Sequence, residues 1–179
     1  TTGVEATTGP LGQGFAMAVG MAMAEAHMAA KFNREGFPVV DNHTFVLMGD
    51  GCMMEGATSE AASLAGTQKL GKLIALYDSN RITIEGDTAT SFAENVAARY
   101  AAYGWQVISV DNGEDVDAIG VAIDAAKSET EKPTLIIVRT NIAQGTAKQG
   151  KASAHGEPLG EENIAAMKAA LGWTYDKFE

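Results

Sequence analysis

Two polar residues at the ends of neighbouring apolar runs have the types and the spacing of a metal-binding pair. Asp50 stands between two glycines, directly after the apolar run at 44–48. Asn80 follows the next apolar run, 72–77, and lies about 30 residues after Asp50, which is the length of one strand–helix–strand unit. Magnesium binds hard oxygen ligands and normally combines one or two protein carboxylates with phosphate oxygens. The pair therefore favours a magnesium ion that holds a diphosphate.

The glycines around Asp50 suit the same chemistry. Gly49 and Gly51 allow a sharp turn and a close approach of the backbone to a phosphate. A helix that we expect to begin near Glu55 would direct its N-terminus towards the anion. A Gly-Asp-Gly turn without any ligand is the alternative, because such turns are common. Asn80 at the matching distance favours the ligand site.

A dinucleotide-binding loop is the competing motif. Gly12-Gln13-Gly14 begins like the pattern G-x-G-x-x-G, but Met17 occupies the position of the third glycine. No strand is expected before this segment, whereas the dinucleotide pattern follows a strand. The sequence therefore argues against a nicotinamide site.

The composition limits the class of protein. The chain has 179 residues, of which 46% are hydrophobic, and this is enough for a domain with a sizeable core. Its formal net charge of -10 argues against nucleic-acid binding, which needs a basic surface. The single cysteine, Cys52, excludes an internal disulfide and indicates a reducing compartment, for which we expect the cytoplasm. No apolar stretch is long enough to span a membrane, so no membrane partner is expected.

The elements that must position the metal pair alternate between strands and helices. Such alternation predicts an α/β fold with a mostly parallel sheet and helices on both faces. Ligands bind at the carboxyl ends of the strands in sheets of this kind, where Asp50 and Asn80 are expected. The expected helices cover residues 11–33, 55–69, 91–102, 116–127 and 161–171, and the expected strands cover 44–48, 72–77, 105–110 and 133–139, with a short extended piece at 81–84.

Three of these segments carry more specific expectations. The first helix is rich in methionine and alanine and apolar around much of its circumference, so it belongs in the core or at a subunit interface. Its glycines, Gly12, Gly14 and Gly20, suggest close packing against another backbone. Ser91 and Glu94 have the spacing of a capping box. The long polar loop at 140–160 is expected to be functional.

From Gly49 to Asn80 the sequence resembles the thiamine diphosphate fingerprint. The fingerprint usually ends in two asparagines, whereas this chain has Asp78-Ser79-Asn80, so only the outer residue keeps the metal-binding type. Four flanking words are similar to the transketolase family in particular, and the resemblance covers essentially the whole chain. These words are Thr7–Gly14, Met48–Gly56, Ser63–Gly66 and His155–Gly160. The resemblance implies the thiamine-diphosphate-binding fold, present here as a single partial domain over residues 1–179.

The resemblance also implies a set of site residues. Asp50 and Asn80 would bind magnesium, or calcium or manganese in its place, with the backbone carbonyl of Ile82 as the third protein ligand. His155 would contact the diphosphate and the substrate as a hydrogen-bonding or acid–base group. Glu55 and Glu60 match acidic positions near a subunit interface. The residues expected to contact thiamine diphosphate are Gly9, Pro10, Leu11, Gly51, Glu55, Asn80, Ile82 and His155.

The activity implied by the resemblance is the transfer of a two-carbon glycolaldehyde unit from a ketose phosphate to an aldose phosphate, in the pentose phosphate pathway. The partners would be sugar phosphates and, in the complete protein, a second subunit in a homodimer. The chain lacks an initiator methionine, a first strand, and the pyrimidine-binding and C-terminal domains of the family. We therefore expect a fragment that is inactive alone. The alternatives are a non-catalytic binding module, or another thiamine diphosphate enzyme such as phosphoketolase, dihydroxyacetone synthase or deoxyxylulose phosphate synthase.

Overall fold

The computed structural model describes residues 2–176, and the chain divides into two compact units. The first unit consists of Thr1–Ser79 and Glu94–Arg139, and the second consists of Asn80–Ala93 and Thr140–Glu179. This division does not test the single domain expected over residues 1–179, which stays a prediction. None of the helices within residues 2–176 combines the length and the apolar character needed to cross a bilayer.

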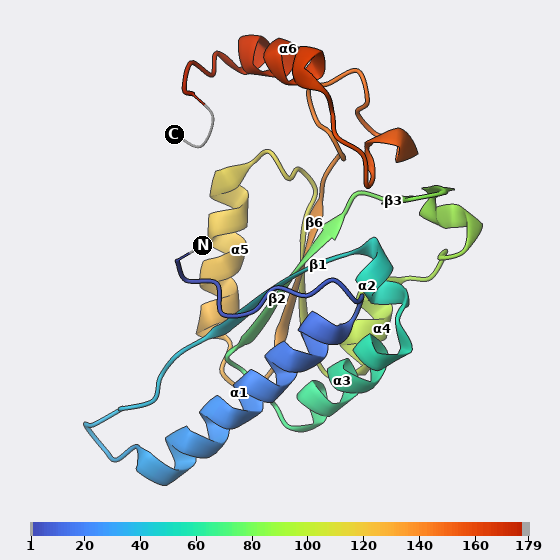
Figure 1. Cartoon of the computed structure of the whole chain (residues 1–179). Helices are drawn as coiled ribbons and strands as arrows, with labels where there is room; N and C mark the ends of the chain where they lie inside the picture. Colours follow the sequence, from blue (N-terminus) through green and yellow to red (C-terminus); the bar gives the residue numbers. More distant parts are fainter. Residues whose placement is uncertain (1, 177–179) are drawn as a thin grey trace. The chain divides into compact units, whose positions relative to one another are not determined.

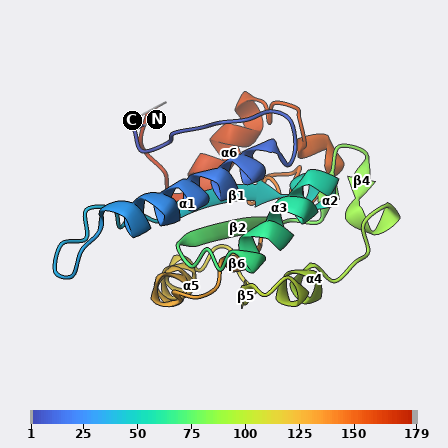
Figure 2. The ribbon, with the colours of Figure 1, turned by 90° about the horizontal axis from the view of Figure 1, so that it is seen from below.

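A four-stranded sheet forms the centre of the first unit. Every pairing in it is parallel, and the strands lie in the order β1-β2-β6-β5, which Figure 2 shows from top to bottom. Apolar residues fill most strand positions, as in sheets that are covered on both faces. The parallel sheet predicted from the sequence is confirmed. The strands are β1 (Thr44–Gly49), β2 (Leu73–Ser79), β5 (Gln106–Val110) and β6 (Thr134–Arg139).

Helices cover both faces of this sheet, as predicted. The chain crosses the sheet in the same direction from β1 to β2 and from β2 to β5, so right-handed connections place α3 (Gly56–Thr67) and α4 (Val96–Ala102) on one face. It returns from β5 to β6, which places α5 (Val116–Ser128) on the opposite face, to the left of the strands in Figure 1. The long helix α1 (Gln13–Phe32) packs on α3 and β1.

The core has one apolar layer on each face of the sheet. An aromatic cluster fills the face of α1 and α4: the ring of Phe15 stacks on Trp105 with centroids 5.9 Å apart, and Tyr100 meets Trp105 edge-on at 5.1 Å. The indole N–H of Trp105 donates to the carbonyl of Ala62 at 2.8 Å, which ties α3 into the cluster. The layer under α5 consists of Ile74, Val110, Ala122, Ala126, Ile136 and Val138.

Helix α1 is amphipathic in the structure, not buried all round. One face is buried, with Phe15 and Val19 at 2% and 3% exposure, whereas methionines on the other face are about 40% exposed. The structure thus excludes a central core position for α1 in the described chain and leaves the subunit interface as the remaining expectation. The exposed methionines are Met17, Met21, Met23 and Met28.

The second unit holds short elements and one regular helix. Strands β3 (Ile82–Thr83) and β4 (Gly86–Asp87) pair as an antiparallel hairpin, which confirms the extended piece expected there. Helix α6 (Glu161–Leu171) has the predicted bounds and ends at Gly172 in the left-handed conformation, at φ 64°. Short 3-10 turns cover Thr88–Thr90 (η1) and Ala152–Ala154 (η2).

The helix expected at 55–69 is confirmed as α3, but a separate short helix that was not expected, α2 (Asp50–Met54), precedes it, and the chain breaks between them at Glu55, which is extended at ψ 134°. Two other local expectations are wrong. The capping box is absent, because α4 begins after Asn95, whose side-chain Oδ1 accepts from the Ala98 N–H at 3.0 Å. Gly20 has no neighbour within 4 Å of where a Cβ would lie, so close packing does not explain it.

Candidate functional site

Asp50 is a buried carboxylate at the carboxyl end of β1. It is the first residue of α2, directly after the strand, and the residue is only 4% exposed. The hydroxyl of Tyr77 on β2 donates to Oδ1 of Asp50 at 2.6 Å. Burial of a carboxylate is costly unless hydrogen bonds or a cation compensate for the lost water. A buried carboxylate at the ligand-binding edge of a parallel sheet is the arrangement that a metal ligand needs.

The strand register places the residue before Asn80 at the same edge as Asp50. Gly49 of β1 pairs with Asp78 of β2, so both strands end together. The Arg139 guanidinium donates to the carbonyl of Ser79 at 2.5 Å and fixes the end of β2. Asn80 follows Ser79 in the chain and is the first residue of the second unit.

The predicted cofactor loop lies against the predicted diphosphate residue. A Cβ added to Gly51 would lie 2.9 Å from Cδ1 of Leu11, so this backbone and the Leu11 side chain are in close contact. Gly12 follows Leu11 in the chain, and a Cβ added to Gly12 would lie 2.9 Å from both the Glu55 side chain and the Thr58 hydroxyl. The structure thus brings Leu11 together with Gly51, and Gly12 together with the start of α3.

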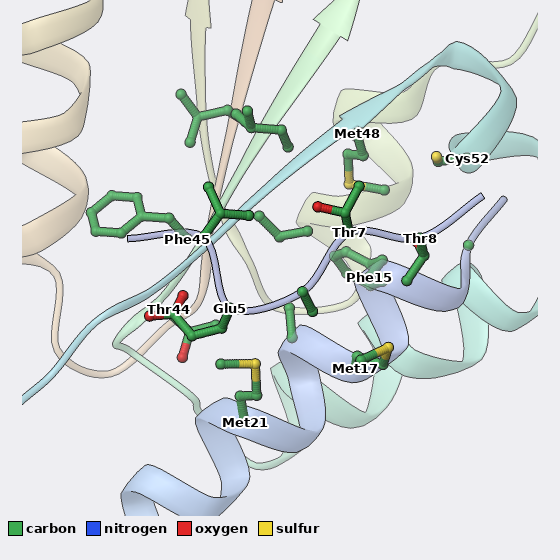
Figure 3. A pocket seen from close by; sticks show the side chains of 18 of the residues that line it. Glu5, Thr7, Thr8, Phe15, Met17, Met21, Thr44, Phe45, Met48 and Cys52 are labelled. Atoms are coloured by element: carbon green, nitrogen blue, oxygen red, sulfur yellow. The ribbon is translucent and has the colours of Figure 1, made fainter. Parts of the chain in front are cut away.

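A cavity of about 580 Å³ opens beside this loop and the outer edge of β1. The segment from Gly3 to Gly12 forms one wall, and α1 and β1 form the others. Figure 3 shows Thr7 and Thr8 of that segment opposite Phe15 and Met48, in a mainly apolar lining. The loop predicted to contact the cofactor is therefore part of the wall of a preformed cavity.

Arg99 of α4 fixes the short helix that carries Asp50. Its guanidinium donates to the carbonyl of Met53 at 2.9 Å, near the end of α2, and to the hydroxyl of Ser59 on α3 at 2.5 Å. Its Nε lies 2.6 Å from a carboxylate oxygen of Glu94. One side chain thereby joins α2, α3 and α4.

In the second unit, Asn80 and Ile82 share one tight turn. Oδ1 of Asn80 accepts from the Ile82 N–H at 2.9 Å, and Arg81 between them adopts a left-handed φ of 62°. The turn brings together two of the three predicted metal ligands, the Asn80 amide and the backbone of Ile82. Both residues are half-buried.

The remaining predicted residues are exposed. His155 follows the turn η2, and its backbone N–H donates to the carbonyl of Ala152 at 2.8 Å. In the first unit, Gly9, Pro10 and Leu11 are exposed. Glu55, the N-cap of α3, and Glu60, within α3, are exposed too. Exposed polar and apolar groups of this kind remain available to a ligand or to a partner.

The chemistry of the predicted ligands suits magnesium better than a transition metal. Within residues 2–176, no group of three or more His, Cys, Asp or Glu side chains is gathered as a metal site. Zinc sites are built from such groups, whereas magnesium is held by few carboxylates together with waters and phosphates. The carboxylate of Asp50, the amide of Asn80 and the carbonyl of Ile82 are all hard oxygen donors of the second kind.

The sequence as a whole matches the family described as transketolase, thiamine diphosphate binding domain, over residues 1–179. This chain belongs to the transketolase family. The transketolase of Streptococcus pyogenes is 60% identical over 179 residues, which are 100% of this chain and 25% of that protein. Transketolase 1 of Saccharomyces cerevisiae is 54% identical over 98% of this chain and 26% of its own length. The chain thus spans about a quarter of the relatives that it matches.

Solved transketolases share the fold of this chain. A crystal structure of Pichia stipitis transketolase in complex with sedoheptulose-7-phosphate aligns with a TM-score of 0.93 at 48% identity, over 96% of this chain and 25% of that one. Transketolase from Leishmania mexicana aligns with a TM-score of 0.94 at 51% identity, over 98% and 27%. The thiamine-diphosphate-binding fold expected from the sequence is confirmed.

Sequence reasoning missed two residues that hold Asp50 and the helix that carries it. Tyr77 is the fifth residue of β2, where a run of apolar residues makes any aromatic look like packing. Arg99 contacts α2 across more than forty residues of sequence. The one available signal was a hydroxyl-bearing aromatic near the end of the strand that leads to Asn80.

Proposed function

We propose that this chain provides the diphosphate- and metal-binding half of a transketolase active site. The complete protein would transfer a two-carbon glycolaldehyde unit from a ketose phosphate to an aldose phosphate. The observation that carries the proposal is the buried carboxylate of Asp50 at the carboxyl end of β1, with Leu11 against the adjacent Gly51. The family match over residues 1–179 supplies the reaction class.

The proposed metal ligands are Asp50, Asn80 and the backbone carbonyl of Ile82, which would hold magnesium or, in its place, calcium or manganese. The shared turn of Asn80 and Ile82 supports this choice, because it presents an amide and a carbonyl from one short segment. The strand register supports it too, since β1 and β2 end at the same edge.

The proposed cofactor contacts fall into two groups. Gly51, Asn80, Ile82 and His155 would lie at the diphosphate end, and Gly9, Pro10 and Leu11 would lie near the pyrimidine. Glu55 would contribute from an acidic position near the subunit interface. When bound, thiamine diphosphate supplies the electron sink that allows a carbon–carbon bond beside a ketose carbonyl to break. The protein residues orient the ligands and polarise them. His155 would hydrogen-bond the diphosphate and the substrate, or act there as an acid–base group.

The wider assignments rest on the same match. We propose sugar phosphates as substrates, a homodimer as the complete assembly, and a cytoplasmic location. The exposed methionines of α1 support a subunit contact, because Met17, Met21 and Met28 recur at helical spacing on the outer side of the helix. A chain of about a quarter of its relatives' length is expected to show no transketolase turnover alone. Turnover by the purified 179-residue chain would contradict that expectation.

The proposal is tested by calorimetric titration of the purified protein with thiamine diphosphate, with and without magnesium. Wild type should bind in a magnesium-dependent manner, and Asp50→Ala should lose that dependence because the metal carboxylate is gone. Asp124→Ala, which removes an exposed carboxylate from α5, is the matched control and should bind like wild type. Equal binding by wild type and Asp50→Ala would refute the assigned metal ligand.

A further inference from the structure

We propose that Tyr77 is a positioning residue for the metal ligand Asp50. Its phenolic hydroxyl holds one carboxylate oxygen and thereby sets the direction in which the carboxylate meets the metal. This inference rests on the proposed function, because it assigns Tyr77 a role only if Asp50 binds a metal.

The geometry of the contact is that of a strong, charge-assisted hydrogen bond. The Oη of Tyr77 lies 2.6 Å from Oδ1 of Asp50, within the short range that hydroxyl-to-carboxylate bonds adopt. Tyr77 and Asp50 are both 4% exposed, so water competes little for either partner. A bond in such surroundings is stronger than the same bond at a surface.

The strand explains why a tyrosine at this position reaches the carboxylate. Side chains alternate along β2, so Tyr77 shares the buried face of Leu73 and Ala75, and it pairs in register with Met48 of β1. Asp50 follows Met48 by two residues. The Tyr77 ring therefore fills the core beside Met48, and only its hydroxyl extends to the level of the carboxylate.

The contact makes the two oxygens of Asp50 different from each other. Oδ1 accepts the phenolic proton, which restricts rotation of the carboxylate and presents the group in one orientation. Groups that hydrogen-bond a metal ligand typically change metal affinity by about 10–100-fold when they are removed. Tyr77 should therefore act on the metal while touching neither metal nor substrate.

The chain offers a matched pair of substitutions for the test. Tyr77→Phe removes the hydroxyl that bonds Asp50 and keeps the ring. Tyr100→Phe removes a fully buried hydroxyl that has no hydrogen-bond partner among the described residues. Both changes delete one oxygen from a core aromatic of the first unit, so they share any general cost of altering the core.

The readout is the magnesium concentration that half-saturates thiamine diphosphate binding, measured by calorimetry or by quenching of protein fluorescence. Tyr77→Phe should raise this concentration about 10–100-fold, while thiamine diphosphate binding at saturating magnesium stays near that of wild type. Tyr100→Phe should leave it unchanged. In an Asp50→Asn background, Tyr77→Phe should have no further effect on metal binding.

The possible failures are distinguishable. If Asp50→Ala keeps the wild-type magnesium dependence, the proposed function fails. If Asp50→Ala loses it and Tyr77→Phe keeps it, only the positioning role fails. A Tyr77→Phe protein that loses its fold, or that shifts only its urea midpoint in the absence of metal, would assign Tyr77 a structural role and overturn the proposal.

Discussion

Gly12 joins the loop Gly9–Leu11 to the rest of the first unit, and replacing it with alanine should be costly. Its φ of 79° is left-handed, a conformation that costs a residue with a Cβ about 1–2 kcal/mol. The added Cβ would lie 2.9 Å from both Cβ of Glu55 and Oγ1 of Thr58. Glu55 Cβ is attached directly to the backbone and cannot swing away, so the loop or α3 must shift. Overpacking of this kind costs about 1–3 kcal/mol.

The unfolded chain offsets part of this loss. An alanine has fewer unfolded conformations than a glycine, which stabilises a protein by about 0.4–1 kcal/mol. We therefore expect Gly12→Ala to lower the free energy of unfolding by about 1–4 kcal/mol. The loss is comparable to that of deleting a buried aliphatic side chain.

Gly20→Ala is the matched control on the same helix. Gly20 lies inside α1, and a Cβ there would have no neighbour within 4 Å. Alanine in a helix interior is preferred over glycine by about 0.5–1 kcal/mol, so this variant should be more stable than wild type. Urea unfolding followed by circular dichroism gives both values, and unchanged slopes would show that the midpoints report stability. A Gly12→Ala protein as stable as Gly20→Ala would refute the packing of the loop on α3.

Two further predictions concern charged side chains of the first unit. Lys72→Met should lower the free energy of unfolding by about 1–3 kcal/mol, because it leaves the 7% exposed Glu25 without its partner at 2.7 Å. Lys69→Met is the control, because it removes only an exposed ion pair and should change stability little. The hydrogen bond from the Lys72 ammonium lowers the pKa of Asp41. Burial alone would lower the pKa of Lys72, but its hydrogen bonds to Asp41 and Glu25 outweigh burial, so the pKa of Lys72 is raised. The part of the advantage of wild type over Lys72→Met that comes from Asp41 should therefore be complete above about pH 4 and fall away in acid as Asp41 becomes protonated. The whole advantage should fall away above about pH 10 as Lys72 loses its proton, which urea midpoints across pH would show. An advantage that grows below about pH 4 would contradict this. Arg99→Met should lower the free energy of unfolding by about 1–3 kcal/mol, because it leaves a carbonyl near the end of α2 without its donor. The amides of α2 should then exchange with solvent faster than those of α5. Equal protection of α2 in wild type and Arg99→Met would count against this role.

Patterns that depend on neighbouring residues were predictable from the sequence. Helix α6 was expected at 161–171 and has those bounds, because two acidic residues begin it and Gly172 ends it. The strands were expected within one or two residues, since apolar runs between polar turns identify them well. The edge at which Asp50 lies also follows from the order of strands and helices along the chain.

Features that depend on competition between local signals were not predictable. Gly49 and Gly51 favour a turn, yet the chain forms the five-residue helix α2 from Asp50 to Met54. The capping-box spacing of Ser91 and Glu94 competes with Asn95, which is an equally good N-cap and is the one used. Sequence alone does not decide between caps four residues apart, because the packing of α4 on β5 sets the start of the helix.

The contacts that orient Asp50 lie further beyond a reading of the sequence. Tyr77 meets Asp50 only through the register of β1 and β2, and a shift of one residue would turn the ring to the other face. Arg99 lies on α4 and contacts Met53 at the end of α2, 46 residues earlier in the chain. Both contacts follow from the three-dimensional arrangement, whereas the metal-binding residue types follow from the chain itself.

Anomalous diffraction from crystals of the protein grown with manganese and thiamine diphosphate would locate the metal directly. We expect one strong manganese peak about 2.0–2.6 Å from a carboxylate oxygen of Asp50, Oδ1 of Asn80 and the carbonyl oxygen of Ile82, the range of hard cation–oxygen distances. Diphosphate oxygens should complete the shell. A peak held by other residues, or bound thiamine diphosphate with no metal beside Asp50, would contradict it.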